Sequence, residues 1–130
     1  MELRKLLLTR LAFGTAGIRG FMRAGYSSMN DLVIIQTSQG LVDYLVMTFG
    51  DEVTKTGLVI GYDARHNSKR FAQRTAIAAI QRNIPVYLYS SIVPTPFIPF
   101  AIKVSRGFPT HVLNFQALRT CELSSVFGDN

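Results

Sequence analysis

The residues best suited to chemistry lie in a glycine-rich segment near the start of the sequence, FGTAGIRG at positions 13–20. Three of its glycines recur at every third position: Gly14, Gly17 and Gly20. A backbone with this spacing can bend sharply and bring its N–H groups close to an anion. Thr15 adds a hydroxyl, and Arg19 adds a planar guanidinium that fits phosphate oxygens. The segment lacks the GK[ST] ending of a P-loop and the preceding strand of a dinucleotide site, so by itself the pattern favours a structural turn.

A second polar segment, GYDARHNSKR at positions 61–70, follows a short apolar run and precedes a helical pattern. Ligands of α/β proteins bind where strands reach their carboxyl ends, and helix N-termini favour anions. Asp63 and Arg65 are close enough in sequence to pair, and we predict that this ion pair braces the turn. His66 has no second ligand at metal-binding spacing, so we expect no metal site.

No further set of side chains forms a recognisable catalytic arrangement. The segment VPTPF at 93–97 is predicted to be a turn stiffened by its prolines. Cys121 is the single cysteine, and its neighbours supply neither a base nor a positive environment for a reactive thiol. His111 and the serines near the end of the sequence suggest no Ser-His-Asp triad.

Four periodic stretches predict the elements that position these segments. They are two helices, over 30–49 and 67–82, and two buried strands, over 57–62 and 84–89. Asn30 or Asp31 is the expected N-cap of the first helix and Asn67 that of the second, with Lys69 and Arg70 on a solvated face. Gly50 and Asp51 are expected to end the first helix. Alternating helices and strands predict right-handed βαβ packing around a largely parallel sheet.

The last part of the sequence differs in character from the rest. Residues 94–102 begin as a proline-paced turn and are expected to continue into a short helix. Residues 104–130 show no clean period and no convincing strand, although three apolar residues fit part of a short amphipathic helix: Leu113, Phe115 and Leu118. We therefore predict an α/β domain over 1–103, followed by a divergent tail over 104–130.

Composition limits the class of protein. A chain of 130 residues with 48% hydrophobic and 17% charged residues can bury a core and is not disordered. No apolar run is long enough to predict a membrane span, and the start lacks the apolar core of a secretory signal. Together with the single cysteine, this predicts a cytoplasmic protein.

The net charge of +6 indicates an anionic partner. The cations are scattered without an aromatic platform, so we expect no nucleic-acid binding.

Taken together, the ordered segments FGTAGIRG, MND with TSQGL, GYDAR with SKRF, IPVYLYS and VPTPFIPFA resemble the first domain of the α-D-phosphohexomutases. Within that family the sequence is similar to the eukaryotic branch that contains phosphoglucomutase-2, phosphopentomutase and glucose-1,6-bisphosphate synthase. The resemblance runs from about Glu2 to about Ile102. It implies a three-layer α/β/α domain with a mostly parallel mixed sheet, here incomplete.

The resemblance also implies a function. Enzymes of this family move phosphate within hexose or pentose phosphates through a phosphorylated serine, with Mg²⁺ and glucose 1,6-bisphosphate as cofactors. By resemblance, Thr15 and Arg19 line the cleft beside that serine, and Arg19 is an active-site cation. Asp63 and Arg65 match the family's Asp-x-Arg turn and, with Gly14, Gly17 and Gly20, are expected to be supporting residues.

The sequence departs from the family pattern after Lys103. The Thr-Ala-Ser-His-Asn-Pro loop that carries the nucleophilic serine is absent, and so is the Asp-Gly-Asp-Gly-Asp metal loop. We therefore expect a truncated first domain that is inactive alone and has no metal ligands of its own. The alternative is a non-catalytic module that binds a sugar phosphate weakly or associates with a full-length relative. Self-aggregation through an exposed sheet edge is also expected.

Overall fold

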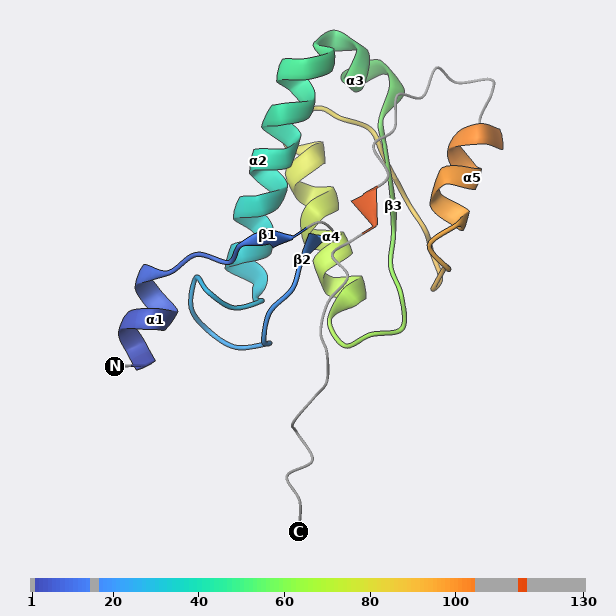
Figure 1. Cartoon of the computed structure of the whole chain (residues 1–130). Coiled ribbons are helices and arrows are strands. Elements are labelled where there is room, and N and C mark those ends of the chain that lie inside the picture. Colours follow the sequence, from blue (N-terminus) through green and yellow to red (C-terminus); the bar gives the residue numbers. More distant parts are fainter. Residues whose placement is uncertain (1, 15–16, 105–114, 117–130) are drawn as a thin grey trace.

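The protein is described from a computed structural model that defines residues 2–14, 17–104 and 115–116 (Figure 1). The helices are α1 (Glu2–Leu8), α2 (Asp31–Phe49), α3 (Asp51–Thr56), α4 (Ser68–Ile80) and α5 (Phe97–Val104). The strands are β1 (Phe13–Gly14), β2 (Gly17–Ile18), β3 (Leu58–Gly61), β4 (Val86–Leu88) and β5 (Phe115–Gln116). The two helices and two strands predicted from periodicity are all present, and so is the short helix after the proline-rich turn. The prediction that both strands are buried is wrong for β4, whose Val86 is half-buried and whose Tyr87 and Leu88 are exposed, because β4 lies at the edge of the sheet.

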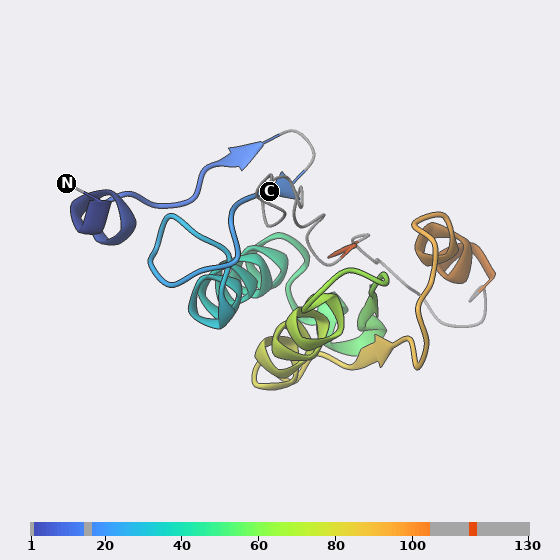
Figure 2. The ribbon, with the colours of Figure 1, turned by 90° about the horizontal axis from the view of Figure 1, so that it is seen from below.

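The central sheet has the strand order β4-β3-β5 and is parallel at both pairings. Its middle strand β3 is buried along its whole length, as its continuous apolar run predicted. Helices α2 and α4 lie on one side of the sheet and α5 lies on the other, which gives the α/β/α layering expected from the family resemblance (Figures 1 and 2). The fold class predicted from the sequence is confirmed.

Strand β5 corrects the prediction that the tail holds no strand. Phe115 pairs with Ile60 and Gln116 with Gly61, in parallel register. Phe115 is therefore in a strand and not in the short amphipathic helix expected around it, while Leu113 and Leu118 lie outside the described residues. A two-residue strand is too short for period-two alternation to show in the sequence, and its pairing with β3 is what defines it.

The main core lies between α2, α4 and the sheet. It contains Val42, Leu45, Leu58, Ile60 and Ala72, all with an exposed fraction of 2% or less. Small residues on α4 let the two helices approach closely, and Ser38 of α2 and Thr75 of α4 form a buried hydrogen bond of 2.9 Å between their hydroxyl oxygens. This packing fixes the direction in which both helices present their N-terminal turns.

Helix α2, with 19 residues and a mean hydropathy of 1.3, is long and apolar enough to pass a test for a membrane span. Within the part of the chain that the structure defines, no other helix passes this test. Here α2 is a core helix, since Val33, Ile34, Ser38, Val42 and Leu45 are buried against the rest of the domain. The same apolar face that raises the hydropathy is used for packing on α4.

The helix termini differ in part from the predictions. Asn30 is the N-cap of α2, and its Oδ1 accepts a hydrogen bond of 3.1 Å from the Val33 N–H. Asn67 stands at the N-cap position of α4, but its backbone is left-handed (φ 64°) and its side chain does not cap the helix. Gly50 ends α2 as predicted, whereas Asp51 starts the short helix α3, which the sequence pattern did not predict.

Candidate functional site

The glycine-rich segment forms a tight antiparallel hairpin of β1 and β2. Phe13 pairs with Ile18, and Gly14 pairs with Gly17. Gly17 has a φ of 92°, which side chains rarely tolerate, so glycine is required there for backbone reasons. Thr15 lies outside the described residues. The prediction of a sharp turn at this segment is confirmed, and the supporting role given to Gly14 and Gly17 is compatible with it.

The hairpin is anchored by one side chain. Ile18 is 1% exposed and packs with Met29, Ile34 and Phe71 in a second apolar cluster. Ile34 belongs to the first turn of α2 and Phe71 to the first turn of α4, so the hairpin sits beside the N-terminal ends of both helices (Figure 1). Gly20 is also closely packed. A Cβ at this position would lie only 2.8 Å from the Leu11 Cδ1 atom, so a larger residue would require Leu11 to move.

Arg19 follows Ile18 directly and is exposed. Side chains of an extended chain alternate between two sides, so a buried Ile18 leaves Arg19 facing away from the cluster. The structure therefore presents the Arg19 guanidinium to solvent at the end of the domain where α2 and α4 begin. A cation in this position is available to an anion that approaches from outside the domain.

The Asp63–Arg65 turn lies at the carboxyl end of β3 and leads into α4. The Arg65 Nε atom is 3.0 Å from Asp63 Oδ2, and the Arg65 N–H donates to Asp63 Oδ1 at 3.0 Å. The Asp63 N–H in turn donates to Ser68 Oγ at 3.2 Å. The predicted ion pair is confirmed, and its backbone contacts show that it shapes the loop between strand and helix.

The hairpin and this turn belong to one face of the domain. The Asn67 side-chain amide donates to the Met22 Sδ atom at 3.9 Å, which links the loop after β2 with the loop after β3. The Lys69 ammonium lies 5.9 Å from the centre of the Tyr62 ring. The loops after β2 and β3 are therefore in contact, and Arg65 and Lys69 follow the carboxyl end of β3, where α/β domains bind ligands.

Arg70 lies on a solvated face of α4, as predicted, with its side chain 59% exposed, and it also pairs with an acidic residue of α2. Its Nε atom donates to Asp31 Oδ2 at 3.0 Å, and Arg74 approaches the same carboxylate oxygen at 3.5 Å. One acidic residue at the start of α2 thus holds two cations of α4. The sequence predicted a solvated face for Arg70, but only the packing of α2 on α4 brings Asp31 opposite Arg70 and Arg74.

A metal ion has no place among the residues that the structure describes. These residues contain no group of three His, Cys, Asp or Glu side chains that converge as metal ligands. The Mg²⁺ implied by the family resemblance needs several oxygen ligands at one point. The described residues do not fit such an ion, because the carboxylates of Asp31 and Asp63 are each engaged by arginine.

A family model named phosphoglucomutase/phosphomannomutase, alpha/beta/alpha domain I, matches residues 10–113 of the chain. The protein belongs to this family, and residues 10–113 correspond to its first domain. The match continues ten residues beyond the predicted boundary at 103, toward β5. The family suggested by the sequence motifs is confirmed.

Characterised relatives narrow the resemblance to one branch. The chain is 50% identical to the phosphopentomutase of Mus musculus and 45% identical to the mouse glucose 1,6-bisphosphate synthase, each over 108 residues, 78% of this chain and 17% of the relative. It is 43% identical to the phosphoribomutase of Saccharomyces cerevisiae over 112 residues, 82% of this chain and 18% of the relative. The chain thus spans less than a fifth of the length of these relatives. No solved structure is significantly similar to it.

Proposed function

We propose that residues 10–113 supply the first wall of a sugar-phosphate cleft in a phosphomutase that acts on pentose or hexose phosphates. The observation that carries this proposal is the 50% identity to phosphopentomutase together with the exposed position of Arg19 directly after the β1–β2 hairpin. Phosphoryl transfer depends mainly on positioning and on neutralising charge at the phosphate, and an exposed guanidinium next to the buried Ile18 can contribute to both.

The residues then have separate roles in this proposal. Arg19 contacts the phosphate, and Thr15 adds a hydroxyl donor. Gly14, Gly17 and Gly20 allow the hairpin to form and to pack closely, and Asp63 with Arg65 keeps the neighbouring turn in shape. The sugar phosphate itself is the proposed partner. Mg²⁺ and glucose 1,6-bisphosphate are proposed cofactors of the whole enzyme, with the metal held by residues outside this stretch. The single cysteine supports a proposed cytoplasmic location.

A chimera tests the role of the domain. Residues 10–113 would replace the matching segment of mouse phosphopentomutase, and conversion of ribose 1-phosphate to ribose 5-phosphate would be measured. We expect the chimera to be active. Arg19→Gln in the chimera is expected to lower kcat/KM by roughly 10²-fold, because one donor to the phosphate is lost.

Lys55→Gln is the matched control, since Lys55 lies in α3, away from the hairpin, and carries the same charge. Equal losses for Arg19→Gln and Lys55→Gln would contradict the proposed role of Arg19. A folded but inactive chimera would contradict the role of the domain.

A polypeptide of these 130 residues alone is expected to have no mutase activity. The sequence contains neither the serine loop nor the acidic metal loop of the family, so it supplies neither nucleophile nor metal ligands. Incubation with glucose 1-phosphate, glucose 1,6-bisphosphate and Mg²⁺ provides the test. Formation of glucose 6-phosphate above the protein-free rate would refute this expectation, whereas weak binding without turnover would support the binding-module alternative.

A further inference from the structure

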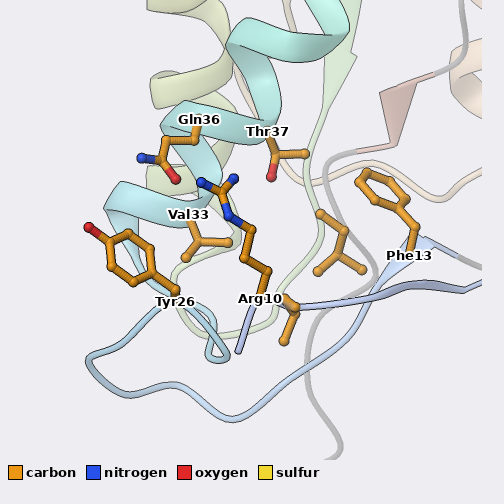
Figure 3. Close-up of a pocket in the computed structure, with 8 residues that line it drawn as sticks. Arg10, Phe13, Tyr26, Val33, Gln36 and Thr37 are labelled. Atoms are coloured by element: carbon orange, nitrogen blue, oxygen red, sulfur yellow. The ribbon is translucent and has the colours of Figure 1, made fainter. Parts of the chain in front are cut away.

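A pocket of about 180 Å³ lies between the N-terminal segment, the β1–β2 hairpin and the first two turns of α2 (Figure 3). Its apolar part consists of Leu11, Ile18 and Val33. The aromatic side chains of Phe13 and Tyr26 stand at its sides. The Leu11 N–H donates to the Tyr26 carbonyl at 3.0 Å, so the backbone on two sides of the pocket is joined directly.

Three polar side chains converge at this pocket. The Arg10 guanidinium points toward Gln36 and Thr37, which lie on adjacent positions of α2 (Figure 3). Within the defined part of the chain, no side-chain hydrogen bond or ion pair joins any of the three to a protein group. A guanidinium, an amide and a hydroxyl together offer several donors, and their hydrogen-bonding capacity is unused by the fold.

The pocket lies on the opposite side of the hairpin from Arg19. Ile18 lines the pocket and is 1% exposed, whereas the next residue, Arg19, is exposed to solvent. Neighbouring side chains of an extended chain leave on opposite sides, and Arg19 is accordingly not among the residues that line the pocket. The two arginines therefore define separate anion-accessible positions.

We propose that this pocket binds the phosphate group of a small phosphate ester. A phosphate monoester has three terminal oxygens, which match the donors of Arg10, Gln36 and Thr37, and the guanidinium supplies the opposite charge. The carbon part of the ligand packs on Leu11, Ile18 and Val33. The volume of about 180 Å³ is sufficient for one small molecule. The site is additional to the proposed sugar-phosphate cleft and does not depend on it.

Calorimetric titration of the 130-residue chain at physiological ionic strength tests the proposal. The ligands are ribose 5-phosphate, inorganic phosphate and ribose, so that ester, free anion and sugar are compared separately. We expect binding of ribose 5-phosphate and no binding of ribose. If inorganic phosphate binds as tightly as the ester, the anion-binding position is supported, but the apolar residues do not contribute to affinity. Ribose binding as tight as that of the ester would overturn the proposal.

Two variants address the pocket. Arg10→Gln is expected to weaken ester binding at least tenfold, and Thr37→Val, which keeps the side-chain shape, is expected to weaken it severalfold. Arg4→Gln is the control, because Arg4 is an exposed cation on α1 outside the pocket. Equal weakening by Arg10→Gln and Arg4→Gln would show a net-charge effect and overturn the proposal. Circular dichroism of each variant checks that it is folded.

Arg19→Gln separates this proposal from the proposed function. Loss of binding in Arg10→Gln with retention in Arg19→Gln supports the pocket, whatever the activity of the chimera. Loss in Arg19→Gln with retention in Arg10→Gln assigns the binding to the cleft face and overturns the pocket. A chain that binds none of the three ligands also overturns it.

Discussion

At the scale of single residues, alanine substitutions at Gly57 and Gly40 are expected to change the stability of the domain in opposite directions. Gly57 has a φ of 88°, and a Cβ there would lie 2.7 Å from the Pro85 carbonyl oxygen. That close approach allows the Leu58 N–H to donate to the same oxygen at 2.7 Å, where the β3–β4 pairing begins. Gly40 lies inside α2, and no atom outside its own helical turn stands within 4 Å of the point where a Cβ would be.

We expect Gly57→Ala to lower the free energy of unfolding by more than about 2 kcal/mol, because backbone strain and a clash with backbone add together. Gly40→Ala is expected to raise it by about 0.5–1 kcal/mol, since alanine removes the entropic penalty of a helical glycine. Urea unfolding of both variants measures the difference. A neutral Gly57→Ala would mean that β3 and β4 do not approach as closely as described.

The Asp63 turn gives a second prediction at this scale. Asp63→Ala removes both the ion pair with Arg65 and the acceptor of the Arg65 N–H, whereas Asp63→Asn keeps an acceptor. Because the ion pair is partly exposed, its own contribution is at most about 1 kcal/mol. We therefore expect Asp63→Asn to be nearly neutral in thermal unfolding and Asp63→Ala to be clearly less stable. Equal melting temperatures for the two would show that the backbone contact is unimportant.

At the scale of secondary-structure elements, the contact of α2 with α4 positions both parts of the candidate site. Ser38 and Thr75 join the helices through their hydroxyls, and Thr75 Oγ1 also donates to the Phe71 carbonyl at 3.0 Å. Both residues are buried, at 1% and 0% exposed. The pair is therefore a polar contact inside an otherwise apolar interface, and its two members are expected to act as a unit.

Removing one member leaves the other buried without this partner. We expect Thr75→Val to cost about 1–3 kcal/mol of stability, and the double variant Ser38→Ala with Thr75→Val to cost less than the sum of the single changes. A double-mutant cycle in chemical unfolding measures the coupling. Strict additivity would mean that the two hydroxyls do not interact in solution.

At the scale of the whole molecule, apolar side chains are exposed at and beyond the β4 edge of the sheet. Tyr87 and Leu88 of β4 are 48% and 38% exposed, and Phe97 and Phe100 of α5 are 51% and 61% exposed. A strand edge with apolar neighbours promotes association between copies. We predict that the 130-residue polypeptide self-associates as its concentration rises.

Leu88→Lys is expected to lower this association, because a charge on an edge strand opposes pairing with another strand. Met47→Lys is the control. Met47 is 86% exposed on α2, so this substitution adds the same charge at a position away from the sheet edge. Light scattering over a concentration series compares the two. If both variants reduce association equally, net charge and not the edge governs it.

The sequence alone determined the elements whose pattern is long and repetitive. Helical spacing predicted α2 and α4, continuous apolar runs predicted β3 and β4, and the ordered motifs identified the family. The Asp63–Arg65 pair was also predictable, because its two members are only two positions apart. These features depend on contacts that are close in sequence or on patterns that extend over many residues.

Only the tertiary structure decided the remaining features. Strand β5 is defined by its pairing with β3, Asp31 is engaged by Arg70 from 39 positions away, and Arg10 lines the same pocket as Gln36 and Thr37 of α2. Each of these depends on how separate elements pack. A local pattern carries no record of which distant side chain will lie opposite, since that is decided by the burial of apolar faces across the whole domain.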